Sequence, residues 1–300
     1  MGALISSSTN KFNLPLFMLV LISSILPDGP IIFIGGPGTI EYLLHRSYSH
    51  SILLAPVYSF ILTLLMFTLF KKYLKNKFIV LYSFSLLAVL SHILLDLITP
   101  FGIELFYPFS NKLYSLDILH SFDPIFLSIS IIVLITFACF LYTRNIKFRT
   151  ITRILSFLYI FYFIFTLISK LYVSNKYKEY LADKIPQANY ISTIPRTFWR
   201  WKGIASNKDN YYAIVENNGI ISHSIYNKKT DIPNTIQEDL TYKKFMKYAR
   251  YPIMTLENNK VIFSNLIYSP DTYKLSYKLD KNYDIVEVNL TGFNIEDKHY

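Results

Sequence analysis

The chain of 300 residues contains a single cysteine, Cys139, which lies inside an apolar run. A disulfide framework and a Cys-x-x-Cys zinc site are therefore excluded, and a cysteine nucleophile is not expected. The sequence also shows no phosphate-binding nucleotide loop, no Gly-x-Ser-x-Gly elbow and no Ser/His/Asp order. These absent motifs therefore give no indication of a nucleotide-dependent, serine-based or cysteine-based mechanism.

Charged residues are also scarce, at 17% against 52% hydrophobic residues, which is too apolar for an ordinary soluble protein. The first 173 residues carry the long apolar runs, whereas residues 174–300 have a soluble composition. The net charge is +10, of which +6 falls in the first part, where 12 basic residues stand against six acidic ones. Because these basic residues gather in short loops, they indicate membrane topology, and no nucleic acid partner is expected.

A helix that crosses a bilayer needs about 20 apolar residues. The first part offers five such segments, the first of them interrupted by Pro27-Asp28-Gly29-Pro30: 14–34, 52–70, 78–98, 125–142 and 154–172. The sequence therefore predicts an α-helical, multi-pass membrane domain of about five spans over residues 1–173, embedded in a lipid bilayer.

The basic loops 71–77 and 144–153 should be cytoplasmic by the positive-inside rule. Segments 28–51 and 97–124 then face the other side of a bacterial inner membrane, together with the C-terminal part. In residues 174–300, apolar and polar residues alternate with period two in four stretches: 211–215, 219–225, 260–267 and 273–279. This pattern predicts a small, soluble, antiparallel β-rich domain, with one possible helix at 234–250.

Six acids and four histidines occur in the first 173 residues, and none lies in the two basic loops. Acids near lipid are costly, so a cluster of carboxylates and imidazoles at one membrane depth indicates a function. His with carboxylate is a common ligand set for a divalent metal, with zinc favoured and manganese or iron possible. The sequence does not reveal the oligomeric state.

Two histidines, His45 and His50, flank Arg46 just before the second apolar segment, and Glu41 precedes His45 by one helical turn. An interfacial loop that caps the next helix is the simpler alternative. His92 and Asp96 are spaced i and i+4, so they share one helical face and could bind one metal or hydrogen-bond each other.

Asp28 lies between Pro27 and Gly29, where a carboxylate can point into a cavity or simply form a turn. Asp123 precedes Pro124, a pattern that strongly favours a helix N-cap, and it would need to face the other segments to be a metal ligand. Considered together, these segments predict a metal site built from facing helices, since a metal would neutralise the acids.

The stretch His45-Arg46-Ser47-Tyr48-Ser49-His50-Ser51 resembles the HRGxTHS signature of the YdjM-type family of membrane-bound, predicted metal-dependent hydrolases, some of which are LexA-regulated. Leu90-Ser91-His92-Ile93-Leu94-Leu95-Asp96, followed by Thr99-Pro100-Phe101-Gly102, is similar to their LSHxLxDxxTPxG signature. Shorter similarities extend the resemblance over nearly the whole length of the chain: Leu26-Pro27-Asp28, Tyr107-Pro108-Phe109-Ser110, Phe122-Asp123-Pro124 and Pro195-Arg196-Thr197-Phe198-Trp199-Arg200-Trp201.

The resemblance implies that the metal ligands are Asp28, His45, His50, His92 and Asp96, with Arg46 as a substrate or structural contact. A distant likeness of the family to zinc-dependent phospholipases C implies chemistry on phosphate esters. This sequence departs from the family pattern in three places. The first ten residues contain no histidine, Pro30 replaces the second Asp of LPDxD, and Ser47 and Ser49 replace Gly and Thr. Fewer metals than in the relatives are therefore an open alternative.

These observations predict a hydrolase in which a metal-activated water attacks an ester of an amphiphilic or lipid-linked substrate, most simply a phosphoester. Arg46 would stabilise developing negative charge, and Glu41 or Asp123 would act as general base. The alternatives are a non-enzymatic membrane protein whose His/Asp cluster conducts ions or protons, and a structural metal site.

Overall fold

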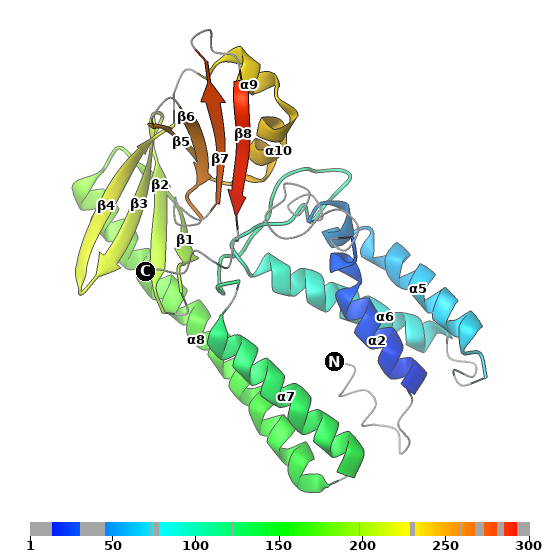
Figure 1. The fold of residues 1–300 in the computed structure, drawn as a ribbon. Helices are drawn as coiled ribbons and strands as arrows, with labels where there is room; N and C mark the ends of the chain where they lie inside the picture. The colour runs from blue at the N-terminus through cyan, green and yellow to red at the C-terminus, as the bar shows by residue number, and fades with distance from the viewer. Residues whose placement is uncertain are drawn as a thin grey trace. The chain divides into compact units, whose positions relative to one another are not determined.

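The structure is a computed structural model. This structure describes residues 14–30, 46–72, 74, 78–121, 123–143, 145–197, 199–228, 232–257, 260–267, 273–280 and 285–292. Helices come first along the chain, and two sets of four strands follow, with two short helices between the sets (Figure 1). The chain divides into two compact units, the second of which includes Pro100–Gly102 and Ile168–Tyr300.

Three helices of the first unit pack side by side: α2 (Leu14–Ile25), α5 (Ala55–Leu69) and α6 (Phe78–Leu97). The serines Ser23, Ser59 and Ser85 are fully buried between them. The hydroxyls of Ser23 and Ser85 lie 2.8 Å apart, and that of Ser85 donates to the Ser59 carbonyl at 3.4 Å. Small side chains let helix backbones approach closely, and the hydroxyls of Ser23 and Ser85 hydrogen-bond within the apolar core.

The prediction of a multi-pass membrane domain with about five spans is wrong. Among the described residues, two helices are long and apolar enough to cross a membrane, α6 and α8 (Ile146–Lys184). The other apolar helical stretches are shorter: Pro15–Asp28, Ala55–Leu69 and Pro124–Phe140. At 1.5 Å per residue, the 15 residues of α5 cover about 22 Å of a hydrocarbon core about 30 Å thick.

The apolar runs overstated the helices because they include residues that form turns. Residues 52–54 and Phe70 were counted in the second span, but they lie in turns outside α5. Pro27 ends α2, and the chain continues there as a single 3₁₀ turn, η1 (Leu26–Asp28). Part of the first predicted span, residues 31–34, lies outside the described residues.

The second unit contains two four-stranded antiparallel sheets, as the period-two pattern predicts. The first has the order β1 (Asn189–Pro195), β2 (Trp201–Ser206), β3 (Asn210–Asn217) and β4 (Ile220–Asn227). The second has the order β5 (Pro252–Glu257), β6 (Lys260–Asn265), β7 (Tyr273–Leu279) and β8 (Ile285–Gly292). Residues from both sheets share one buried cluster that includes Ile204, Ile253 and Leu266, so the sheets have a common core.

Turn chemistry explains two boundaries in this unit. Asn218 and Gly219 both have positive φ, at 50° and 81°, which is the geometry of a tight hairpin turn between β3 and β4. The predicted helix over 234–250 is instead two helices, α9 (Asn234–Glu238) and α10 (Leu240–Tyr248). Asp239 is extended between them, and its carboxylate caps α10 by accepting from the Tyr242 amide at 3.0 Å.

The C-terminal half of α8 packs on the first sheet (Figure 1), with Tyr177, Leu181 and Ile185 in the shared core. A side chain at Gly203 on β2 would lie 2.7 Å from the Tyr177 ring, so glycine permits this close approach. The helix runs without interruption through residues 173 and 174. No break in secondary structure marks the predicted boundary between residues 1–173 and 174–300, and this boundary stays a prediction.

Lys202 on β2 is buried, at 7% exposed, and its ammonium donates to the Leu266 carbonyl at 2.8 Å. Burial lowers the pKa of this group from 10.5 to about 8, and the nearby Arg196 adds to the shift. Between these two values the unfolded chain binds more protons than the folded chain, so the free energy of unfolding should rise with pH. We expect a rise on the order of 3 kcal/mol from pH 8 to 10.5. Denaturant unfolding at several pH values should show this rise in the parent and in Lys278→Met, and not in Lys202→Met.

Candidate metal site

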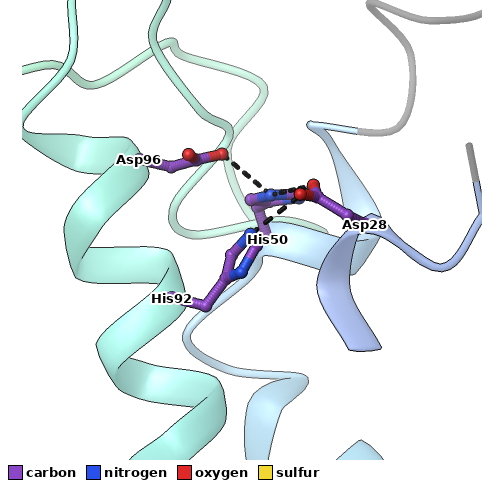
Figure 2. A group of neighbouring side chains, drawn as sticks. All are labelled: Asp28, His50, His92 and Asp96. Carbon is purple, nitrogen blue, oxygen red and sulfur yellow. Dashed lines mark ion pairs between the residues drawn. The ribbon is translucent and has the colours of Figure 1, made fainter. Parts of the chain in front are cut away.

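Four side chains of the first unit converge on one point (Figure 2): Asp28, His50, His92 and Asp96. Each offers one ligand atom, and these atoms all lie within 4.8 Å of one another. Asp28 ends η1, His50 ends a second 3₁₀ turn, η2 (Tyr48–His50), and the other two lie on α6. Three chain segments thus deliver two imidazoles and two carboxylates to the same place.

Local structure explains how each side chain is held there. His92 and Asp96 are one helical turn apart on α6 and so point the same way. The turn that carries His50 is tied to the segment after α6 by two backbone hydrogen bonds. In these, Glu104 N donates to the Arg46 carbonyl at 3.1 Å and Ile52 N to the Leu105 carbonyl at 3.0 Å.

The spacing of the donor atoms fits a small divalent cation. His50 Nε2 lies 2.9 Å from Asp96 Oδ2 and 3.4 Å from Asp28 Oδ1, and His92 Nε2 lies 3.5 Å from Asp28 Oδ1. Ligands about 2.0–2.1 Å from a tetrahedral zinc ion would be separated by about 3.3 Å. The three separations lie on both sides of that value, so the four residues could hold such an ion.

Hydrogen bonds on the far side of each imidazole orient the rings. His92 Nδ1 lies 2.8 Å from the Ser24 carbonyl, which can only accept, so this nitrogen carries the proton. The other nitrogen, Nε2, then presents its lone pair to the other three side chains. His50 Nδ1 lies 3.0 Å from the Ser49 hydroxyl. Metal-binding histidines commonly have such outer partners, which fix the tautomer and the ring orientation.

Burial and charge are uneven around the group. The side chain of His50 is fully buried, those of His92 and Asp96 are 17% and 18% exposed, and that of Asp28 is 42% exposed. Water can therefore reach the group from the Asp28 side. Arg46 Nη2 lies 3.6 Å from Asp96 Oδ2, which adds a positive charge beside the two carboxylates.

The remaining predicted site residues have different outcomes. His45 and Glu41 lie outside the described residues. Asp123 is not among the four converging side chains. Its Oδ1 accepts from the Ile125 and Phe126 amides at 3.0 and 2.9 Å, and its Oδ2 accepts from the Tyr162 hydroxyl at 2.7 Å. The structure thus gives Asp123 the N-cap of α7 (Pro124–Thr143), and its role as a general base stays a prediction without geometric support.

The capping geometry makes a direct prediction for Asp123. Asp123→Ala should lower the free energy of unfolding of the purified protein by about 1 kcal/mol or more. The substitution removes the helix cap and the hydrogen bond from Tyr162. Metal content, measured by mass spectrometry on the same sample, should not change. Loss of hydrolysis in a folded, metal-loaded variant would instead support the general-base role.

Glu104 is a buried acid that the sequence did not single out, and it is not among the four converging side chains. Its side chain is fully buried in the segment that is tied to Arg46, five residues after Thr99. The sequence gives no signal for this, because Gly102-Ile103-Glu104 has no ligand spacing and the burial of one carboxylate in a loop depends on tertiary contacts.

The fold and site define a largely helical N-terminal unit whose His/Asp group could hold a metal ion. The chain belongs to the YdjM inner membrane protein family, whose model matches residues 1–171. The family resemblance is thereby confirmed, and the family and the two long apolar helices together indicate a membrane protein. The chain is also similar to the uncharacterized protein YfhP of Bacillus subtilis (strain 168), with 25% identity over 234 residues, 75% of this chain and 68% of that protein. No solved structure matches the chain.

Proposed function

We propose that the protein is a membrane-bound, metal-dependent hydrolase that cleaves an ester, in particular a phosphoester of a lipid or lipid-linked molecule. The observation that carries the proposal is the convergence of two imidazoles and two carboxylates at metal-ligand spacing, with Asp28 accessible to water. Membership of the YdjM inner membrane protein family is compatible with it.

Zinc is the favoured metal, because a mixed set of two nitrogen and two oxygen donors at this spacing suits it, with manganese or iron as alternatives. When bound, such a metal lowers the pKa of a coordinated water and so supplies a nucleophile at neutral pH. His50, His92, Asp28 and Asp96 would hold it, and the family pattern adds His45 as a further candidate.

The charges of the site favour an anionic substrate. The charges of two carboxylates would cancel the charge of a divalent ion. The guanidinium of Arg46 then gives the site a net charge of about +1. The guanidinium would bind a phosphate oxygen and stabilise the negative charge that develops on it. Of the two predicted general bases, Glu41 keeps that role in the proposal, because both oxygens of Asp123 are engaged elsewhere.

We further propose that the group lies at the non-cytoplasmic boundary of a bacterial inner membrane. His92 and Asp96 lie in the last two turns of α6, whereas Lys71 and Lys72 precede its first turn. If the lysine end of α6 is cytoplasmic by the positive-inside rule, then the candidate site is near the opposite surface. An amphiphilic substrate could reach that depth by diffusing within the bilayer.

One observation favours a second candidate, a structural metal. Structural zinc sites have four protein ligands, whereas catalytic sites keep one position for water, and four protein donors converge here. Such a metal would hold α6, η1 and η2 together without catalysis.

The test is a combined measurement of metal content and hydrolysis on the full-length protein in detergent. The parent should contain zinc and, in mixed micelles, release inorganic phosphate from phosphatidic acid or glycerol phosphate from phosphatidylglycerol. Asp28→Asn should lose hydrolysis, whereas Asp183→Asn, an exposed surface carboxylate, should behave as the parent. Bound metal without hydrolysis of any phospholipid tested would favour the structural alternative, and a parent without metal after zinc reconstitution would overturn both.

A further inference from the structure

We propose that the turn between β1 and β2 is a membrane-surface anchor, in which Arg196, Trp199 and Arg200 bind the headgroups of anionic phospholipids. This inference concerns the second unit and does not depend on hydrolysis by the metal site. It rests on where the turn is fixed on α8, on the exposure of its aromatic side chain and on its charge.

The turn is fixed at one level of α8. The Arg196 amide donates to the Arg200 carbonyl at 2.7 Å, which closes the turn. At its base, the Trp201 indole donates to the Ser169 hydroxyl of α8 at 3.1 Å, and the Tyr177 hydroxyl donates to the Trp201 carbonyl at 3.1 Å. The hairpin is therefore held beside residues 169–177 of the helix.

At that level α8 changes from apolar to charged. Ile168, Leu171 and Tyr172 are 60%, 57% and 70% exposed, in line with an apolar segment of which only 11% is buried within the protein. Lys176, Lys178 and Glu179 follow within two turns. If α8 enters the bilayer with its apolar segment, the membrane surface then lies close to the base of the hairpin.

The side chains of the turn suit that surface. Trp199 is 65% exposed, whereas Trp201, two residues on, is 6% exposed and belongs to the core. An indole ring with an apolar body and a polar N–H partitions to the boundary between headgroups and acyl chains. Arg196 and Arg200 are also exposed, and guanidinium groups bind phosphate oxygens with two parallel hydrogen bonds.

The local charge favours an anionic lipid over a second copy of this chain. Residues 184–208 contain no Asp or Glu, and the turn exposes two basic residues, Arg196 and Arg200. Two such surfaces facing each other would repel, whereas phosphatidylglycerol would neutralise them. The anchor would also set the depth of α8, because the turn and the helix are joined at Trp201.

The chain has only two tryptophans, so each can be observed separately. Full-length Trp201→Phe, in which Trp199 is the sole tryptophan, is reconstituted into vesicles of phosphatidylcholine brominated near the headgroup, with or without phosphatidylglycerol. We expect the brominated lipid to quench Trp199 at least about twofold, and more strongly with phosphatidylglycerol present. Trp199→Phe, which reports on buried Trp201, should be quenched less. Adding Arg196→Gln and Arg200→Gln to the Trp199 reporter should remove the dependence on phosphatidylglycerol.

Resistance to carbonate extraction establishes that the protein is inserted in the vesicles. If the Trp199 emission of such inserted protein is not quenched, the proposed anchor is wrong. A blue-shifted but unquenched emission would overturn the anchor as well, since it indicates a protein contact. Quenching that is independent of phosphatidylglycerol would overturn the anionic headgroup as the ligand. If Trp201→Phe does not fold, the difference in quenching between the parent and Trp199→Phe gives the same information.

Discussion

Replacing His92 with alanine is expected to lower the affinity for the bound metal by more than about 100-fold, and to abolish hydrolysis with it. His92 contributes a nitrogen that lies 3.5 Å from the Asp28 carboxylate, and its other nitrogen donates to the Ser24 carbonyl at 2.8 Å. The substitution therefore removes one ligand and the link between α6 and the end of α2. Titration of the metal-free protein with zinc, followed by calorimetry, measures the affinity directly.

The matched control for this prediction is the neighbouring Ser91→Ala. The Ser91 hydroxyl donates to the Ala88 carbonyl of its own helix at 2.7 Å, so its loss should leave the metal site intact. Circular dichroism establishes that both variants keep their helices. Parent-like zinc affinity in folded His92→Ala would show that the ring is a structural partner of Asp28, and the proposed ligand set would then be rejected.

The sequence predicted the four converging side chains because their signals are local or strongly patterned. His92 and Asp96 share a helical face whenever residues 92–96 are helical, and a carboxylate at Pro27-Asp28-Gly29 falls at a helix end. What the spacing could not give was the partner of each residue. His50 meets Asp28 and Asp96 only because α2, α5 and α6 pack together, which is a tertiary property.

Asp123 shows that one sequence pattern can fit two different roles. An Asp before Pro at a helix start satisfies both a capping pattern and a ligand pattern, and only the surroundings distinguish them. In the structure the amides of Ile125 and Phe126 and the Tyr162 hydroxyl engage its carboxylate. The complete burial of Glu104 is also a tertiary property, because nothing in the neighbouring sequence predicts that a loop carboxylate is buried.

The number of membrane spans was overestimated for a related reason. Hydropathy counts apolar residues whether they are helical or not, and the short apolar helices α2 and α5 each bury one side against α6. The strands were easier to predict. The stretches in which apolar and polar residues alternate, 211–215 and 273–279, coincide with β3 and β7. In β7, Leu275 and Tyr277 are buried and Ser276 between them is more exposed, and such a period of two is distinct from the continuous apolar run of a membrane span.

Replacing Arg46 with methionine is expected to lower kcat/KM for a phospholipid substrate by about 100- to 1000-fold while leaving the metal in place. The guanidinium lies 3.6 Å from Asp96 Oδ2 and is 13% exposed, so it stands beside the carboxylate without being a metal ligand itself. Methionine preserves much of the buried volume but removes the positive charge that would meet a phosphate oxygen. Arg46→Lys should recover only part of the loss, because an ammonium cannot make two parallel bonds to phosphate.

The metal content of the same samples decides between two roles for Arg46. If the guanidinium acts on the substrate, Arg46→Met retains zinc, and the loss appears for anionic phosphoesters more than for a neutral carboxylic ester of similar size. If instead it only positions Asp96, then zinc affinity falls together with activity on both substrates, and Arg46→Lys restores both. Lys112→Met, an exposed basic residue of the first unit, serves as the control for a general change in surface charge. A parent-like kcat/KM in Arg46→Met would remove the argument that the charge of this site selects an anionic substrate.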